Sequence, residues 1–436
     1  MVAPRPPVST VQFLDSYCEL YQNLFPEVRS FENFKYLHLG MISNIKRKTL
    51  PEIAKVVGLD NEQSLHHFLT RSPWGAKELR NRRLEIILNV LQGRSIILII
   101  DETGDKKKGK STDYVKRQYI GNIGKIESGI VVVTAYGYLD GITFPLTFEV
   151  FKPKGTLKES DSYKTKPEIA GKMIEDLQAL GFKFELVLAD ALYGESDVNF
   201  ISILNKFKIN YLVAIRSNHG VWLPKEQKVR RNKWRKFTRT FTNGTREIRY
   251  IREIIFGKRR PRQYWQITTD IETLPDSSTW YVMSNIPGVK YNEIGNLYGL
   301  RTWVEYGLKQ SKNELGWADF RVTNYSVIAK WWEIVMSAYL MVSLHSEKLN
   351  QSLSFIPDKF KQHQLWDSDR SWKNLLNNLY LIVQPFICFN LIKIWLKVFP
   401  IPQLSLGFPR LISIMNLFDI CDFTSYFSDS YYRSTA

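Results

Sequence analysis

The sequence predicts an α/β protein in which a mixed sheet is flanked by helices, interrupted by a β-rich insertion, and joined to helical regions at both ends. Apolar runs at residues 96–100, 184–188 and 211–215 have the length and composition of strands buried on both faces. Helical periodicity dominates before residue 92 and after residue 291. We expect five segments, with residue ranges 1–92, 93–216, 217–290, 291–349 and 350–436.

The composition indicates a globular protein with a polyanionic partner. A net charge of +17 on 436 residues attracts nucleic acid or an acidic membrane surface. Three scattered cysteines, Cys18, Cys388 and Cys421, suit a reducing compartment better than a disulfide framework. The first residues lack the pattern of a secretory signal, and the apolar stretch 379–399 contains Pro385 and two lysines, which favours a buried helix over a membrane span. We expect a cytoplasmic protein.

Residues 1–92 are predicted to form a helical, helix-turn-helix-like DNA-binding domain. Thr49 and Glu52 have the spacing of a capping box, Gly58 suits the end of the first helix, and residues 63–69 suit a second one. Such spacing also occurs in helical bundles that do not bind DNA.

Residues 93–216 are predicted to form the first part of a catalytic domain. A strand at 96–100 ends at Asp101, and strands 129–140 and 142–151 form a hairpin around Asp140 and Gly141. A helix at 167–180 leads to the strand at 184–188, which precedes Asp190. Because ligands of open α/β sheets bind at the carboxyl ends of strands, Asp101 and Asp190 should be neighbours if their strands are adjacent. Each aspartate alone could be an ordinary turn or capping residue.

Residues 217–290 are predicted to form a basic β-strand insertion. Lysine and arginine are dense between residues 225 and 262, where aromatic side chains alternate with them. Arg230, Arg231 and Arg235 are candidate contacts to DNA phosphates. A solvated β-sheet face is the alternative interpretation.

Residues 291–349 complete the predicted catalytic domain. Tyr298, Arg301, Glu305 and Lys312 are spaced by three, four and seven residues, which places them on one face of a helix. Arg301 and Glu305 could equally be a solvated ion pair. Residues 326–343 form an apolar core helix in this interpretation, and 350–436 form a helical region with a possible role in dimerisation.

Three separate acids suggest metal-assisted phosphodiester chemistry. Asp101, Asp190 and Glu305 supply the oxygen ligands that Mg²⁺ prefers, and two such ions, with Mn²⁺ as a substitute, would neutralise the attacking and leaving oxygens. The histidines lack zinc-ligand spacing, and no serine or cysteine lies in a nucleophile motif. Water or a DNA 3′-hydroxyl is the expected attacking group.

From about residue 96 to 343 the chain resembles bacterial insertion-sequence transposases of the DDE, RNase H-like superfamily, in the cut-and-paste group with a Y-R-E-K signature. Asp101-Glu102-Thr103 is similar to that group's first motif, Ala189-Asp190-Ala191-Leu192-Tyr193-Gly194 to the second, and Tyr298, Arg301, Glu305 and Lys312 to the signature. The resemblance implies an RNase H-like fold with Asp101, Asp190 and Glu305 as catalytic and metal-binding residues. It also implies cleavage of double-stranded DNA at the element's terminal inverted repeats, with strand transfer to target DNA by a homodimer near the nucleoid.

The resemblance suggests further DNA contacts. Trp280 is similar to a tryptophan that stacks on a flipped-out base, although a core indole is an equal alternative. Arg301 and Lys312 would hold phosphates, and Tyr298 would orient one of them. Arg117, near the first aspartate in sequence, is a further candidate contact. Glu102 and Asp105 place additional acids beside Asp101.

Two other functions stay open at this point. A related endonuclease would hydrolyse DNA without strand transfer, and an inactive descendant would bind DNA only as a regulator. The intact set of three acids counts against the regulator.

Overall fold

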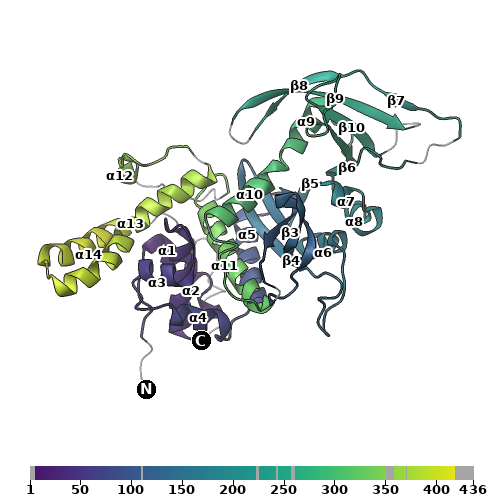
Figure 1. Ribbon diagram of the computed structural model, residues 1–436. Helices are drawn as coiled ribbons and strands as arrows, with labels where there is room; N and C mark the ends of the chain where they lie inside the picture. Colours follow the sequence, from purple (N-terminus) through teal and green to yellow (C-terminus); the bar gives the residue numbers. More distant parts are fainter. Residues whose placement is uncertain are drawn as a thin grey trace. The chain divides into compact units, whose positions relative to one another are not determined.

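The computed structural model describes residues 5–109, 111–221, 225–241, 244–256, 261–349, 358–369 and 371–417. The chain forms two compact units (Figure 1). Met1–Gln92, Ser111–Asp113 and Lys309–Ala436 make up the first, and Gly93–Lys110 and Tyr114–Leu308 make up the second. Cys421 and residues 258–260 of the basic stretch lie outside the described residues.

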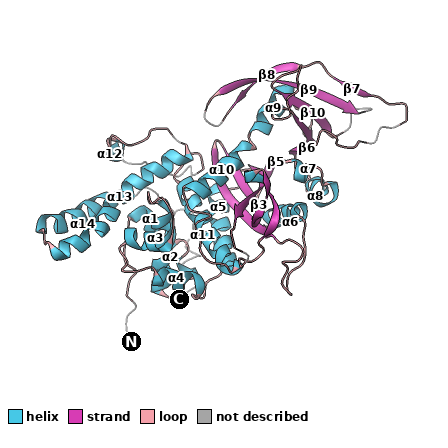
Figure 2. Cartoon of the chain, viewed as in Figure 1, coloured by secondary structure: helices cyan, strands magenta, loops and turns pink. Residues whose placement is uncertain are grey.

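The second unit is built on one mixed sheet of eleven strands (Figure 2). The strand order is β2-β3-β1-β5-β6-β11-β10-β9-β7, with β4 paired to β3 and β8 paired to β9. The first six strands in the chain are β1 (Ile96–Lys106), β2 (Lys116–Ile120), β3 (Lys125–Leu139), β4 (Ile142–Phe151), β5 (Phe184–Ala189) and β6 (Tyr211–Ile215). The remaining five are β7 (Val229–Arg231), β8 (Arg235–Thr240), β9 (Arg246–Phe256), β10 (Gln263–Thr268) and β11 (Trp280–Ser284).

The middle of this sheet has RNase H-like topology. Strands β1, β5 and β6 run parallel to one another, and β3 runs antiparallel to both β1 and β4. Leaving out β2, the order β4-β3-β1-β5-β6 reads 3-2-1-4-5 along the chain. The β3–β4 hairpin turns at Asp140 (φ 48°) and Gly141 (φ 89°), whose positive φ angles suit a tight two-residue turn. The predicted fold class is confirmed.

The insertion strands extend this sheet. Strand β11 pairs antiparallel with β6 on one side and with β10 on the other, so β7–β11 continue the hydrogen-bonded ladder of the central strands. The helices of this unit are α6 (Lys166–Ala179), α7 (Ala191–Gly194), α8 (Ser202–Lys206), α9 (Tyr291–Gly299) and the first part of α10 (Thr302–Asn313). Helix α6 packs against β3 and β4, and α9 packs against β8 and β9.

Helix α9 lies unusually close to the insertion. A Cβ atom on Gly295 would come within 2.3 Å of the Phe237 ring on β8. Only a glycine lets the helix approach that strand so closely without a shift of the ring. The insertion strands and the segment that carries Tyr298 are therefore packed as one body.

The first unit is helical. Its helices are α1 (Gln12–Glu19), α2 (Val28–Ile42), α3 (Leu50–Val57), α4 (Gln63–Thr70), α5 (Ala76–Leu91), α11 (Tyr325–Leu344), α12 (Asp358–Lys361), α13 (Trp372–Val398) and α14 (Pro402–Asn416). Helix α11 is almost wholly buried, as its apolar sequence predicts. Within this core Arg83 and Glu333 form a buried ion pair at 2.9 Å. Burial lowers the pKa of His38 to about 4, which keeps that imidazole neutral beside Ser337.

Helices α3 and α4 have the predicted helix-turn-helix spacing. Helix α3 ends at Gly58, whose φ of 77° is left-handed, as expected for a glycine that ends a helix. The predicted capping box is wrong, because Thr49 makes no side-chain cap and Glu52 pairs with Lys55 instead. DNA binding by this pair of helices remains a prediction.

Helix α13 corrects the expectation of a buried helix at residues 379–399. Its first half packs against other helices, whereas Ile394, Trp395 and Val398 near its end are about two-thirds exposed. Among the described residues, α11 and α13 are long and apolar enough to cross a membrane by length and composition alone. Most of the apolar window of α11 is buried (83%), whereas only 28% of that of α13 is.

Candidate active site

Asp101 and Asp190 lie side by side at the carboxyl edge of two adjacent parallel strands. Residues Ile100 on β1 and Ala189 on β5 are the last register partners of the parallel pair, and each aspartate follows directly. The sequence-based expectation that they are neighbours is confirmed. The expectation that β1 ends at Asp101 is wrong, because the strand continues to Lys106 in antiparallel pairing with β3.

Asp190 is fixed by the short helix that follows it. Its carboxylate accepts a hydrogen bond from the Leu192 backbone N–H at 2.9 Å, and so caps α7. Gly194 at the end of α7 lies against β6, where an added Cβ would be 1.9 Å from the Ala214 carbonyl oxygen. Since no other residue fits this contact, the glycine of the second motif sets how close α7 and Asp190 lie to the sheet.

Arg301 joins the third acid to the first. Its guanidinium lies 3.0 Å from Asp101 Oδ2 and 2.6 Å from Glu305 Oε1, so one side chain bridges two carboxylates that are far apart in sequence. The Glu305 side chain is half exposed, whereas those of Arg301 and Asp101 are largely buried. The solvated ion-pair interpretation of Arg301 and Glu305 is therefore incomplete, since the same guanidinium also holds a buried aspartate.

The Y-R-E-K residues do not occupy one uninterrupted helix. Tyr298 lies in α9, Arg301 lies in the turn between the two helices, and Glu305 and Lys312 lie in the first and last turns of α10. Backbone hydrogen bonds to the carbonyl three residues earlier tighten this turn, including Arg301 to Tyr298 at 3.1 Å and Val304 to Arg301 at 3.2 Å. The Tyr298 and Arg301 side chains still interact: burial raises the pKa of Tyr298, whereas the charge of Arg301 and its side-chain hydrogen bond act to lower that pKa.

The electrostatics link all three acids. Burial raises the pKa of Asp101 to about 7, with Arg301 acting against the rise and Asp190 and Glu305 adding to it. Burial lowers the pKa of Arg301, but Tyr298 and the carboxylates of Asp101 and Glu305 outweigh it and raise that pKa overall. A buried carboxylate whose pKa lies near neutrality, with a specific charged partner, is typical of functional sites.

The additional acids near Asp101 are placed differently. Glu102 follows Asp101 on β1 and so faces the opposite side of the sheet, where its carboxylate lies 2.5 Å from Lys166 Nζ. Asp105 is buried four residues further along the strand. Neither residue shares the Arg301 bridge.

Trp280 lies in a cluster of cations. The guanidinium carbon of Arg249 is 4.2 Å from the centre of a Trp280 ring, that of Arg239 is 5.1 Å away, and the Tyr298 ring is 5.8 Å away. Arg239 and Arg249 are nine-tenths buried or more. Neither arginine was among the predicted contacts, although Arg239 lies two residues after Phe237 on β8 and Arg249 lies two residues before Ile251 on β9, so each shares a strand face with an apolar side chain.

The other candidate DNA contacts lie on exposed strands. Arg117 is exposed on β2, and Arg230 and Arg231 are exposed on β7. Arg235 begins β8 with its guanidinium 5.0 Å from the centre of the Tyr291 ring. These placements leave their role in DNA binding a prediction.

The donor chemistry of the three acids fits a divalent cation. Carboxylate oxygens are the ligands that Mg²⁺ and Mn²⁺ prefer. Within the described ranges, no group of three or more His, Cys, Asp or Glu side chains is gathered tightly enough to hold an ion. Arg301 stands between two of the acids instead, so closing these ligands around a metal would require the guanidinium to release at least one carboxylate.

An RNase H-like sheet with acids at the ends of two central strands, and a third acid on a later helix, defines the class of enzymes that process phosphodiester bonds. A family model for DDE superfamily endonucleases matches residues 21–241, which include Asp101 and Asp190. The chain is also 66% identical, over 325 residues, to a protein of Microchaete diplosiphon named probable transposase for insertion sequence element IS701. That alignment covers 74% of this chain and 86% of the relative.

The chain therefore belongs to the DDE superfamily endonucleases, in the branch of insertion-sequence transposases, and is an enzyme that acts on DNA. Endonucleases of this superfamily depend on divalent metal ions. Among solved structures, a piggyBac transposase synaptic complex with hairpin DNA aligns with a TM-score of 0.44 and 13% identity, over 93% of this chain and 81% of the other. A likeness of that size adds nothing to the assignment.

Proposed function

We propose that Asp101, Asp190 and Glu305 form the catalytic centre of a transposase that cuts DNA at the ends of its insertion sequence and transfers the freed 3′-hydroxyl to target DNA. The observation that carries the proposal is the Arg301 bridge between Asp101 and Glu305, beside Asp190 at the same strand ends. Three acids from distant parts of the chain thereby share one charged centre.

The side chains of the site would have separate roles in phosphodiester cleavage. Two Mg²⁺ ions held by the three acids would neutralise the attacking and leaving oxygens. Arg301 balances the carboxylates in the absence of DNA, and its planar guanidinium suits a phosphate that displaces it from them. Tyr298 is buried against Arg301 and limits the directions in which that guanidinium can turn. Lys312, in the last turn of α10, is a further candidate for a phosphate contact.

We also propose that two copies act together, because joining both ends of an element brings two DNA ends to one assembly. Support comes from α13 and α14, whose exposed apolar residues include Leu406 and Trp395. Apolar surface of this extent on one helical pair is typical of protein interfaces. We further propose that the enzyme acts in the cytoplasm at the nucleoid, because its proposed substrate is the DNA there.

The decisive experiment is cleavage and joining by the Glu305→Gln variant. This variant keeps the size of the side chain and loses its charge, so we expect binding of duplex end DNA close to that of wild type. We expect cleavage in Mg²⁺ to fall by about a hundredfold or more. Undiminished cleavage would remove Glu305 from the mechanism.

A precleaved end separates transposition from simple hydrolysis. The wild-type enzyme should join a precleaved 3′-hydroxyl end to a target plasmid. Cleavage without any joining would instead identify an endonuclease.

A further inference from the structure

One face of the insertion gathers buried positive charge around Trp280. Arg249 on β9 is the cross-strand partner of Phe237 on β8, and Arg239 follows Phe237 two residues later. Cross-strand partners and residues two apart point to the same face of a sheet, so both arginines share the face that α9 covers at Gly295. Both guanidinium groups lie over the Trp280 ring, which therefore holds two cations at once.

Arg239 is buried without a counterion of its own. It is 4% exposed, and its guanidinium also lies over the Phe241 ring at 4.5 Å. Glu247 is the carboxylate that most influences Arg239, but its ion pair, at 2.7 Å, is with Arg249. Within the described ranges no carboxylate pairs with Arg239, and its Nε has no acceptor. Because a buried charge is costly unless it is paired, these arginines are suited to an anion that binds from outside.

This excess charge lies beside Arg301. An added Cβ on Gly299 would be 3.0 Å from Arg239 Nε, so the glycine at the end of α9 leaves room for the Arg239 guanidinium two residues before Arg301. Burial lowers the pKa of Arg239, and the like charges of Arg249 and Arg301 act in the same direction. The two acids that Arg301 bridges neutralise that side chain. Arg239 is therefore left as a cation without a fixed partner next to the candidate active site.

A phosphodiester group has the charge and the acceptors that this pair of arginines lacks. Guanidinium groups bind phosphate oxygens through parallel N–H donors, and stacking on an aromatic ring fixes the plane of each group beforehand. Nε is the only nitrogen of Arg239 that is enclosed without a partner, which leaves its two terminal nitrogens as donors. At Arg249, Nε donates to Glu247 and Nη1 is enclosed, which leaves Nη2. Inorganic phosphate offers the same oxygens, but a DNA strand that enters the neighbouring catalytic site brings its phosphates to this place.

We propose that Arg239 and Arg249 bind one backbone phosphate of the DNA end and thereby position the strand that enters the candidate active site. Trp280 acts as a positioning residue, because its ring holds both guanidinium groups, and this role needs no contact with a base. The site reads no sequence, since every nucleotide carries the same phosphate. The inference rests on the proposed action on DNA, but it concerns residues apart from the three acids and the Y-R-E-K signature.

The test combines single protein variants with single uncharged phosphates. Short end duplexes each carry one methylphosphonate, in which a methyl group replaces a charged oxygen, at successive positions around the cleavage site. Binding is measured in EDTA, where no cleavage occurs. For the wild-type protein we expect a position at which the replacement weakens binding about tenfold, the effect of one charge-assisted hydrogen bond. In Arg239→Gln the unmodified duplex should bind more weakly by a similar factor. The replacement at that position should then cost nothing further, because both changes remove the same contact.

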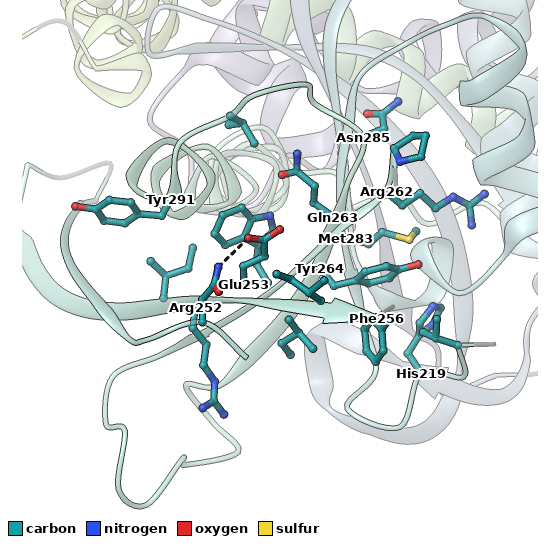
Figure 3. A pocket seen from close by; sticks show the side chains of 18 of the residues that line it. His219, Arg252, Glu253, Phe256, Arg262, Gln263, Tyr264, Met283, Asn285 and Tyr291 are labelled. Carbon is teal, nitrogen blue, oxygen red and sulfur yellow. Dashed lines mark hydrogen bonds between the residues drawn. The ribbon is translucent and has the colours of Figure 1, made fainter. Parts of the chain in front are cut away.

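Arg252→Gln is the matched control, since it removes an arginine from β9 on the other face of the sheet. Arg252 follows Ile251 directly and is the cross-strand partner of Gln266. In Figure 3 its side chain points away from that of Glu253, its other neighbour on the strand. This variant should keep the wild-type response to each methylphosphonate.

Thermal stability separates phosphate binding from a merely structural role. Because Arg239 is buried without a counterion, Arg239→Gln should melt at the wild-type temperature or above it in the absence of DNA. If this variant does not fold, Arg249→Gln should lose the same phosphate contact, and its partner Glu247 is already more than a third exposed. A wild-type pattern of methylphosphonate sensitivity in the folded variants would overturn the proposal. If inorganic phosphate raises the wild-type melting temperature while that pattern persists, the site holds a free anion and not DNA. None of these measurements uses cleavage, which tests the three acids independently.

Discussion

At the scale of single residues, Arg301 is the side chain on which the candidate active site depends. It binds Asp101 and Glu305 at once, from a turn between two helices. With the Arg301 guanidinium in place, the carboxylates of Asp101, Asp190 and Glu305 can all be charged at once. Without it, their mutual repulsion and burial would favour protonation.

The pH dependence of cleavage should reflect Asp101. Its pKa of about 7 is raised by burial, so a large share of Asp101 is protonated at pH 6 and most is ionised at pH 8. Because a protonated carboxyl is a poor metal ligand, single-turnover cleavage at limiting Mg²⁺ should rise through pH 7 and level off above it. Higher Mg²⁺ should move the midpoint to lower pH.

The Arg301→Gln variant provides the matching control for that pH profile. Loss of the cation removes the influence that lowers the pKa of Asp101. The midpoint of any residual cleavage should then lie above the wild-type value. A midpoint that stays in place, or falls, would show that Asp101 does not govern the profile.

At the scale of elements, α7 holds Asp190 in place through a contact that only glycine permits. Gly194→Ala would drive a methyl group into the Ala214 carbonyl, so we expect a loss of about 1–3 kcal/mol in the free energy of unfolding. Cleavage should fall further than stability alone explains, because Asp190 caps the displaced helix. Gly220→Ala, where an added Cβ meets no atom within 4 Å, is the control for both denaturation and cleavage assays.

The positive charge of the insertion leads to a prediction about the salt dependence of DNA binding. If Arg230, Arg231 and Arg235 contact phosphates, replacing all three by Gln should flatten the plot of log binding constant against log salt concentration. The slope should change by at most about 0.9 per arginine. Filter binding of end DNA over a range of NaCl concentrations measures this slope, and an unaltered slope would place the phosphate contacts elsewhere.

Much of the catalytic half could be predicted from the sequence because its strands are short, apolar and buried on both faces. The runs at residues 96–100, 184–188 and 211–215 correspond to strands β1, β5 and β6, and that order brings Asp101 and Asp190 together. The extension of β1 to Lys106 was missed, because its polar residues pair with β3 through the backbone, which side-chain pattern does not reveal.

Contacts between segments that are distant in the sequence were harder to predict. The break between α9 and α10 carries no proline, and helical spacing continues across it. The arrangement of Arg239 and Arg249 around Trp280 depends on the register of β8, β9 and β11, which alternation alone does not fix. The insertion joins the central sheet through the pairing of β11 with β6, which alternation alone does not fix either.

At the scale of the whole molecule, the charge of +17 and the exposed apolar helices point to assembly on DNA. Trp395 and Leu406 are 66% and 74% exposed on α13 and α14. In the double variant Trp395→Glu, Leu406→Glu, the proposed dimer on end DNA should become a monomeric complex in sedimentation velocity. The single variant Lys393→Glu, which leaves Trp395 and Leu406 unchanged, is the control for added negative charge. A double variant that still pairs two copies would assign dimerisation to another surface.

The most direct test of the central claim is the binding of Mn²⁺, measured by electron paramagnetic resonance with end DNA present. If Asp101, Asp190 and Glu305 share one metal-binding centre, the Asp101→Asn, Asp190→Asn and Glu305→Gln variants should each lose bound Mn²⁺ while still binding the DNA. Wild-type Mn²⁺ binding in all three variants would contradict the account.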